Sequence, residues 1–347
     1  MTARPGKGVG NLRVGRAMRR GFWLCAALAA SVASGPASGA AAAVPDAAAD
    51  FPVRPVRWVV GFAPGASNDV IARTIGARLA ETWGQQFIVD NRTGAAGMIG
   101  GDIVARATPD GYTVLLSTSG PSVNGPLLSR KPLYRIEDFT QVAVVAYSPL
   151  IIVVQPSFAA KGPRELVEYL KANPGKVNWG SSGVNGSLHI GLAVFEAATG
   201  VRVTHVPYKG AAVGLIDVAG GQIQGMHTTA ASAEAAIRGQ RVRVLAVAGP
   251  KRIPSLPDVP TLAEAGIRDG DSLVWFGMAA PLRTPAAVVR KLNDGINRAL
   301  AVPDVQRRLG DLGMELVGGP VAEAGRFVRA EADRIRKLIA AGVLTPE

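Results

Sequence analysis

A short apolar strand, a tight loop of small residues and an amphipathic helix follow one another over residues 59–78. Apolar side chains recur at positions 71, 75 and 79, which is the spacing of one helix face. Small residues let backbone N–H groups turn toward one point, and the positive end of the helix dipole reinforces them. The stretch therefore predicts either an ordinary strand-to-helix turn or an anion site. Three residues are candidates for the helix N-cap: Ser67, Asn68 and Asp69.

The same strand–loop–helix unit recurs along the chain. Further strands are predicted at 87–90 and 112–116, and this order implies parallel βαβ units. Long apolar stretches at 142–154 and 274–281 predict two strands that cross to a second series of units and back. We therefore expect a two-lobed α/β fold of the Venus flytrap type, with mostly parallel sheets flanked by helices and the crossing strands as hinge. The strands of the second series are predicted at 177–180, 201–206, 223–226 and 241–248.

This order divides the chain after the N-terminal segment into discontinuous parts. The first lobe is predicted to comprise residues 51–148 and 278–347, and the second lobe residues 149–277. About 300 residues are enough for two such cores. Parallel strands present their loops at one edge of the sheet, so we expect a binding cleft between the lobes.

Residues 1–43 have the composition of an export signal peptide. A basic flank without acidic residues precedes a short apolar run and then small residues, and cleavage is expected between positions 40 and 49. The apolar run is too short to span a bilayer, and Met18 offers a more usual start for such a signal. Arg19 and Arg20 leave the twin-arginine route open beside the general export route. We therefore expect a periplasmic protein whose signal peptide is cleaved.

Charge, cysteine and histidine content exclude several classes of function. Six basic residues lie in the first 43 positions, so a net charge of +12 falls to +6 after cleavage and leaves no nucleic-acid footprint. The sole cysteine, Cys25, lies in the predicted signal, so neither disulfides nor thiol chemistry are expected. Phe22 stands where a lipoprotein signal needs leucine, and the histidines lack metal-ligand spacing. We expect a monomer without metal or cofactor.

A second loop, over residues 181–189, combines small polar residues with glycines ahead of a helix. Its donors and the helix dipole favour an anion, although a capped turn would have the same sequence. Two such loops on opposite lobes could hold one carboxylate between them. Neither a nucleophile elbow nor a phosphate-binding loop occurs in the sequence. The predicted ligand-binding residues are Phe62, Gly65, Ala66, Ser67, Asn68, Asp69, Ser117, Thr118, Ser119, Ser181, Ser182, Asn185, Ser187, His189, Tyr208 and Thr228.

An ordered set of short segments carries a family resemblance. The segments are 52–69, 91–97, 109–113, 181–189, 205–210, 256–261 and 275–277. Together they resemble the extracytoplasmic solute receptors of the tripartite tricarboxylate transporter family, often called Bug receptors, over nearly all of residues 51–342. The resemblance implies a periplasmic two-lobed protein that closes on a carboxylate and holds it by backbone amides, small hydroxyls and ordered waters. It also implies that residues 62–69, 181–189 and the loop after Leu116 touch the ligand.

Two departures from the family pattern bear on the ligand. Gly65 and Ala66 stand where the family usually has paired glycines, which would make one backbone approach wider. His227, Thr228 and Thr229 stand where the family often has an Asp-Asn pair. An aspartate there would suit a ligand amine or hydroxyl. Its loss disfavours amino-acid ligands and points to a plain or aromatic carboxylate.

These observations favour a binding protein that delivers a small organic carboxylate to the membrane subunits of such a transporter. A ligand-presenting co-sensor for a signalling receptor stays open as an alternative, because the same fold serves both roles. A periplasmic hydrolase or transferase using Ser182, His189 and Asp69 is a third hypothesis, which no base–nucleophile spacing supports. We therefore expect a solute-binding protein and not an enzyme.

Overall fold

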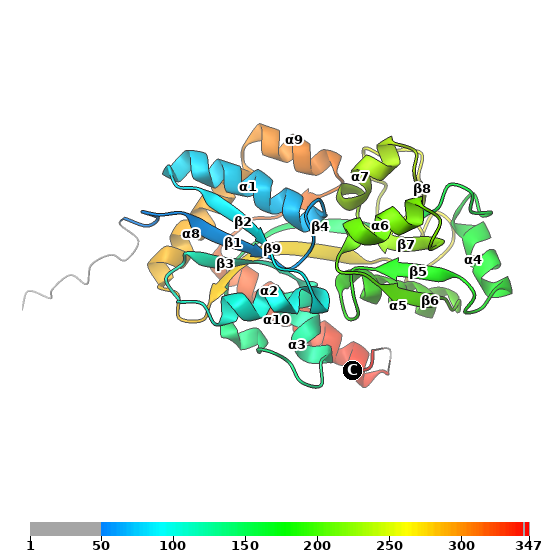
Figure 1. Cartoon of the computed structure of the whole chain (residues 1–347), viewed down its shortest axis with the longest axis horizontal. Helices are drawn as coiled ribbons and strands as arrows, with labels where there is room; N and C mark the ends of the chain where they lie inside the picture. Colours follow the sequence, from blue (N-terminus) through cyan, green and yellow to red (C-terminus); the bar gives the residue numbers. More distant parts are fainter. Residues whose placement is uncertain (1–49, 343, 347) are drawn as a thin grey trace, which may run out of the picture. The chain divides into compact units, whose positions relative to one another are not determined.

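The computed structural model describes residues 50–342 and 344–346 (Figure 1). The predicted export signal, its cleavage region and the start at Met18 lie outside the described residues. Within the described part of the chain, no helix combines the length and the apolar character needed to cross a bilayer. The fold is α/β and two-lobed, as the sequence predicts.

The first lobe begins with alternating strands and helices. Helix α1 buries Ile71, Ile75 and Leu79, the three positions that the helical spacing singles out. It ends at Gly84, whose φ of 66° lies in the left-handed region that glycine adopts without strain. The elements up to the first crossing strand are β1 (Val56–Val60), α1 (Ser67–Trp83), β2 (Phe87–Asn91), η1 (Ala95–Gly97), α2 (Met98–Ala105), β3 (Thr113–Thr118), η2 (Gly120–Asn124), α3 (Gly125–Leu128) and η3 (Ile136–Asp138).

The second lobe repeats the strand-to-helix pattern between the two crossing strands, β4 (Phe139–Val154) and β9 (Leu273–Pro281). After β9 the chain returns to the first lobe and is mainly helical. The elements between the crossing strands are α4 (Pro163–Ala172), β5 (Asn178–Ser181), α5 (Ser187–Thr199), β6 (Thr204–Pro207), α6 (Ala211–Ala219), β7 (Gly225–Thr228), α7 (Ala230–Arg238) and β8 (Arg243–Ala248). Those after β9 are α8 (Ala286–Leu300), α9 (Pro303–Asp311), β10 (Glu315–Leu316) and α10 (Val321–Ala340).

The sheet is parallel within each series of units and antiparallel at the crossing strands. Strand β1 pairs in parallel with β2 and β3, and β5 pairs in parallel with β6 and β7. Strands β4 and β9 run antiparallel to each other from one lobe to the other (Figure 1). Strand β4 then continues past Pro149 and pairs antiparallel with β7 and β8. The carboxyl ends of β1, β3, β5 and β7 therefore lead into loops that face the gap between the lobes.

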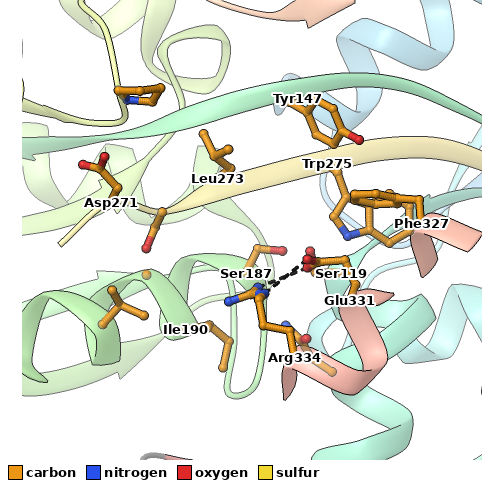
Figure 2. Close-up of a pocket in the computed structure, with 15 residues that line it drawn as sticks. Ser119, Tyr147, Ser187, Ile190, Asp271, Leu273, Trp275, Phe327, Glu331 and Arg334 are labelled. Atoms are coloured by element: carbon orange, nitrogen blue, oxygen red, sulfur yellow. Dashed lines mark hydrogen bonds and ion pairs between the residues drawn. The ribbon is translucent and has the colours of Figure 1, made fainter. Parts of the chain in front are cut away.

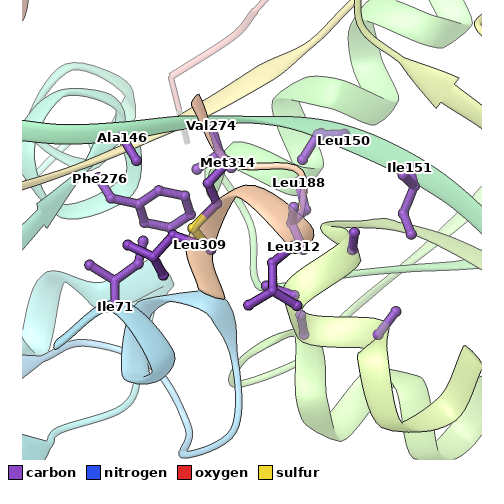
Figure 3. Close-up of a cluster of buried hydrophobic side chains, with 14 of the residues drawn as sticks. Ile71, Ala146, Leu150, Ile151, Leu188, Val274, Phe276, Leu309, Leu312 and Met314 are labelled. Carbon is purple, nitrogen blue, oxygen red and sulfur yellow. The ribbon is translucent and has the colours of Figure 1, made fainter. Parts of the chain in front are cut away.

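Apolar packing is continuous along the crossing strands. Ala146, Leu150 and Ile151 of β4 belong to the same buried cluster as Phe276 of β9 (Figure 3). The cluster also contains Ile71 of the first lobe and members of the second. Strands β4 and β9 are therefore packed against both lobes. Further members drawn in Figure 3 are Leu188, Val274, Leu309, Leu312 and Met314.

Several local predictions differ from the structure. Helix α7 was not predicted, because a segment made mostly of alanine gives little periodic contrast. The chain after β3 forms η2 and α3 where only a loop was expected, and the short β10 was not predicted either. The N-cap of α1 is Ala66, with extended backbone and no side-chain capping bond, so the prediction of Ser67, Asn68 or Asp69 as cap is wrong. Those three residues form the first turn of the helix.

Candidate functional site

Four helices begin at one small pocket between the lobes, which we call the polar pocket. Ser67, Ser187 and Ala211 are the first residues of α1, α5 and α6, and Thr229 is the N-cap of α7. Each of these helices is at least nine residues long, so each contributes first-turn N–H groups that have no acceptor within the helix, and a positive dipole end. The full lining is Phe62, Ala66, Ser67, Asn68, Thr118, Ser182, Ser187, Leu188, Ala211, Thr229, Ser232, Val274 and Phe276.

A cluster of three hydroxyls joins the two lobes at this pocket. The backbone N–H of Ser67 donates to Ser232 Oγ at 3.1 Å, and the two serine Oγ atoms lie 2.9 Å apart. Thr229 Oγ1 is hydrogen-bonded to Ser67 Oγ and lies 3.0 Å from Ser232 Oγ. Thr229 also caps α7 by accepting from Ser232 N at 3.3 Å. Hydroxyls of the second lobe thus occupy the acceptor positions at the N-terminus of α1.

The lining of the polar pocket has no charged side chain among the described residues. Asp69 is close in sequence, but its carboxylate accepts from Gly65 N at 3.2 Å and from Arg73 at 2.9 and 3.0 Å. Burial raises the pKa of Asp69, whereas these hydrogen bonds lower it, and the net shift is downward. Asp69 is therefore an ionised structural group that fixes the loop. The anion preference of the pocket comes from dipoles and hydroxyls.

The polar pocket is narrow. It holds about 30 Å³, far less than the roughly 300 Å³ or more of pockets that enclose small organic ligands. Its apolar walls come from Phe62 and Leu188 and from Val274 and Phe276 of β9. Thr118 Oγ1 is buried in the same lining and has no hydrogen-bond partner among the described residues. Such an atom is costly to bury unless a partner reaches it.

The loop before α5 is hydrogen-bonded to two histidines. Ser181 Oγ lies 2.6 Å from His205 Nε2, and Asn185 N donates to His189 Nδ1 at 3.1 Å. The two imidazole rings stack, with centroids 4.1 Å apart and planes 11° from parallel. Burial and the neighbouring His189 lower the pKa of His205 to about 4. The His205 ring is thus favoured in its neutral form where it contacts the loop at Ser181.

The same loop approaches the first lobe closely. A Cβ on Gly183, whose φ is +118°, would lie 3.4 Å from the backbone N of Ala96 in η1. Glycine adopts this conformation without strain and leaves room for the opposite lobe. The lobes are therefore in close contact on this side of the polar pocket.

The structure brings seven of the predicted residues together in the polar pocket. They are Phe62, Ala66, Ser67, Asn68, Thr118, Ser182 and Ser187. The two loops named by the sequence therefore do face one cleft, through Ser67 on one side and Ser182 and Ser187 on the other.

The other predicted residues lie outside this lining. Most have internal partners: Ser117 bonds to Ser122 and Gln141, Asp69 to Arg73, Ser181 to His205, Asn185 to His189, and Tyr208 to Asp217. Gly65 is exposed beside α6, Ser119 lines a different pocket, and Thr228 is fully buried next to Thr229.

Sequence reasoning missed Thr229 and Ser232, which supply the second lobe's share of the hydroxyl cluster. The sequence does contain an indication of Thr229, because a threonine directly before a run of good helix formers is typical of a helix N-cap. His227 does not line the pocket. It is fully buried and accepts from Trp179 Nε1 at 2.9 Å, and burial lowers its pKa to about 3. Across the described residues, no group of three potential ligands could hold a metal ion.

A two-lobed α/β fold with an uncharged, donor-lined pocket between its lobes defines a solute-binding protein. The chain matches the family model of the tripartite tricarboxylate transporter family receptor over residues 71–344. The chain therefore belongs to this family, and the family predicted from the residues is confirmed.

Known relatives extend this match over most of the chain. A "UPF0065 protein in tcbD-tcbE intergenic region" of Pseudomonas sp. (strain P51) is 39% identical over 290 residues, covering 83% of this chain and 86% of the relative. The solved structure "R. palustris Rpa4515 with adipate" is 34% identical, has a TM-score of 0.82, and covers 86% of this chain and 100% of its own. "MatC (Rpa3494) from Rhodopseudomonas palustris with bound malate" is 33% identical, with a TM-score of 0.78 and coverage of 83% and 100%.

Proposed function

We propose that this protein captures a small organic carboxylate between its lobes and delivers it to the membrane subunits of a tripartite tricarboxylate-type transporter. The observation that carries the proposal is the meeting of four helix N-termini and several hydroxyls in a pocket without charged side chains. The structural relatives described above with adipate and with malate support a carboxylate as the ligand.

The proposed mechanism is closure of two lobes about the crossing strands. We take the lobes as residues 51–148 with 278–347 and residues 149–277, with bending of β4 and β9 between them. A carboxylate is larger than the polar pocket as it stands, so ligand entry requires the lobes to part and the Ser67–Ser232 hydrogen bonds to open. The acid oxygens would then accept from the groups that now bind each other.

The ligand contacts in this proposal are the predicted residues that line the pocket, together with Thr229 and Ser232. The protein acts in the periplasm after removal of its signal peptide. It acts as a binding protein and not as an enzyme. Asp69 is engaged by Arg73, and His189 accepts from Asn185 N, so two members of the hydrolase hypothesis already have structural roles.

Calorimetric titration and thermal-shift assays of the exported protein with a panel of mono- and dicarboxylates test the proposal. At least one acid should raise the melting temperature, because a ligand that binds only the folded state stabilises it. Ser67→Ala and Ser187→Ala should each weaken the binding of that acid by about tenfold or more, since hydrogen bonds to charged groups contribute ~1.5–3 kcal/mol. Ser157→Ala, an exposed serine in the second lobe, is the matched control. Absence of stabilisation by every acid of the panel would contradict the function.

A further inference from the structure

A second and larger pocket lies against the other side of strand β9 (Figure 2). We call it the apolar pocket. It holds about 450 Å³, within the range of pockets that enclose small organic ligands. Its walls come from α5, α10 and the two crossing strands, so both lobes contribute. The lining is Ser119, Asn124, Tyr147, Ser187, Ile190, Gly191, Val194, Pro250, Asp271, Ser272, Leu273, Trp275, Phe327, Glu331 and Arg334.

The two pockets meet at the free edge of β9. Val274 and Phe276 line the polar pocket, whereas the alternating residues Leu273 and Trp275 line the apolar pocket, so the two pockets lie on opposite faces of the strand. Strand β3 pairs only with the segment from Phe276 onward, which leaves the preceding residues of β9 without a partner strand on that side within the described chain.

The two pockets border each other at two points of the chain around this edge. Ser187, the first residue of α5, lines both of them. Thr118 lines the polar pocket, and its neighbour Ser119 lines the apolar pocket. The two pockets are therefore neighbours at the end of β3 and the start of α5, so parting of the lobes at this point would join them.

The apolar pocket is aromatic on its first-lobe side. The rings of Trp275 and Phe327 lie 5.3 Å apart edge to face, and those of Tyr147 and Phe327 lie 5.4 Å apart. Ile190, Val194 and Leu273 continue the apolar surface toward the second lobe. This surface offers a ligand mainly hydrophobic burial. It also holds the indole N–H of Trp275, a buried donor without a hydrogen-bond partner among the described residues.

The charges of the apolar pocket disfavour a second acid group. Its cation among the described lining residues is Arg334, whose guanidinium donates to both carboxylate oxygens of Glu331 at 3.1–3.2 Å. Asp271 adds a further carboxylate, so the lining is net negative. Burial raises the pKa of Tyr147, and the nearby carboxylates Glu331 and Glu315 raise it further. Figure 2 draws the Glu331–Arg334 ion pair as dashed lines, with Asp271 apart from it on the side of Leu273.

We propose that the ligand is a monocarboxylate with an alkyl or aryl body, whose acid group lies in the polar pocket and whose body lies in the apolar pocket. This inference rests on the proposed function and names the substrate class of the same cleft. The polar pocket supplies donors without room for a long chain, and the apolar pocket supplies room without a free cation. The two compartments together therefore select against a carboxylate at the far end of the ligand.

Titration calorimetry with butyrate, hexanoate, octanoate and adipate tests the inference. Each buried methylene should tighten binding by about fourfold until the apolar pocket is filled. Adipate has the six-carbon chain of hexanoate with a second carboxylate, and it should bind at least tenfold more weakly than hexanoate. An affinity that is independent of chain length, or adipate binding more tightly than hexanoate, would overturn the inference while leaving the proposed function intact. If none of the four acids nor any acid of the wider panel binds, the proposed function itself fails.

A substitution that fills the apolar pocket provides the second test. Val194→Trp should weaken the binding of octanoate at least tenfold and leave that of butyrate within about twofold, because only the longer chain reaches the position of Val194. Val213→Trp, the same change at an exposed position of α6, should alter neither ligand. Leu273→Trp, at a half-exposed position of β9, replaces the first variant if it does not fold. Equal weakening of both acids in every folded variant would contradict the two-compartment assignment.

Discussion

The loops that begin α1 and α5 deliver the same kind of group to the polar pocket, but they are held in different ways. Each ends in a serine at a helix N-terminus, and each contains glycine with positive φ, at Gly65 and Gly183. The first loop is fixed by a carboxylate that accepts from Gly65 N and from Arg73. The second is fixed through Ser181 by His205.

The difference lies in charge and exposure. Asp69 is 7% exposed, but its partner Arg73 is 56% exposed, so the ion pair borders on water and is screened by salt. His205 is partly buried and stacked on His189, and both burial and this neighbour disfavour its protonation. Loss of the Arg73–Asp69 ion pair should therefore destabilise the protein only slightly. Protonation of His205, beside the α5 loop, should destabilise it more.

Acidification should affect the protein through its histidines, and this is the largest effect we expect. The pKa of His205 is about 4 in the folded protein and 6.5 in an unfolded chain, so only the unfolded chain binds the proton between these values. The free energy of unfolding should thus be greatest above pH 6.5 and fall as the pH drops toward 4, by about 1–2 kcal/mol for this residue, because its partial exposure weakens the effect. His227, with a pKa of about 3, adds a loss over a similar range. Denaturant unfolding at pH 7 and pH 4.5 measures the sum.

His205→Gln isolates the contribution of the α5 loop. The variant should lose the part of the pH dependence that His205 supplies and keep the part due to His227. Asp69 does not interfere, because a carboxyl pKa lowered from 3.8 affects stability only at lower pH. A pH dependence unchanged in His205→Gln would refute the assignment of this support.

Loss of the Arg73 guanidinium should have the smaller effect. Arg73→Met keeps the apolar stem and removes the ion pair with Asp69, which should cost about 0.5–1 kcal/mol in unfolding free energy. The difference should shrink in 1 M salt, and ligand affinity should change by less than about threefold. Arg290→Met, an exposed arginine of α8, serves as control. A loss of unfolding free energy above about 2 kcal/mol would mean that the protein depends on Arg73 at the α1 loop as strongly as on His205 at the α5 loop.

Much of the fold follows from local patterns in the sequence. The strands and most helices were predictable because apolar runs of strand length alternate with helical spacing, as in β1 and α1. The crossing strands were predictable because residues 142–154 and 274–281 are long and apolar with no accompanying turn. Ser67, Ser182 and Ser187 were predictable as pocket residues because small polar residues precede helices at strand ends.

The rest depends on contacts between distant parts of the chain. The alanine-rich α7 has no stripe of large apolar residues, so the local sequence does not predict that it packs beside α1. The contact of Ser232 with Ser67 was unpredictable for the same reason. Ser117 and Ser181 are small polar residues like their neighbours in the sequence. Because side chains alternate along a strand, these two point to internal partners, Ser122 and His205. The apolar pocket brings together α5, β9 and α10, which are far apart in the sequence.

A crystal structure of the protein with hexanoate tests the central claim, that uncharged donors at helix N-termini hold the acid group. Our account predicts the carboxylate oxygens at about 2.7–3.2 Å from donors of the polar pocket, such as Ser67 and Ser187, with the alkyl chain directed toward Trp275. A carboxylate bound instead to the guanidinium of Arg334, with the polar pocket still closed by Ser67, Thr229 and Ser232, would contradict it.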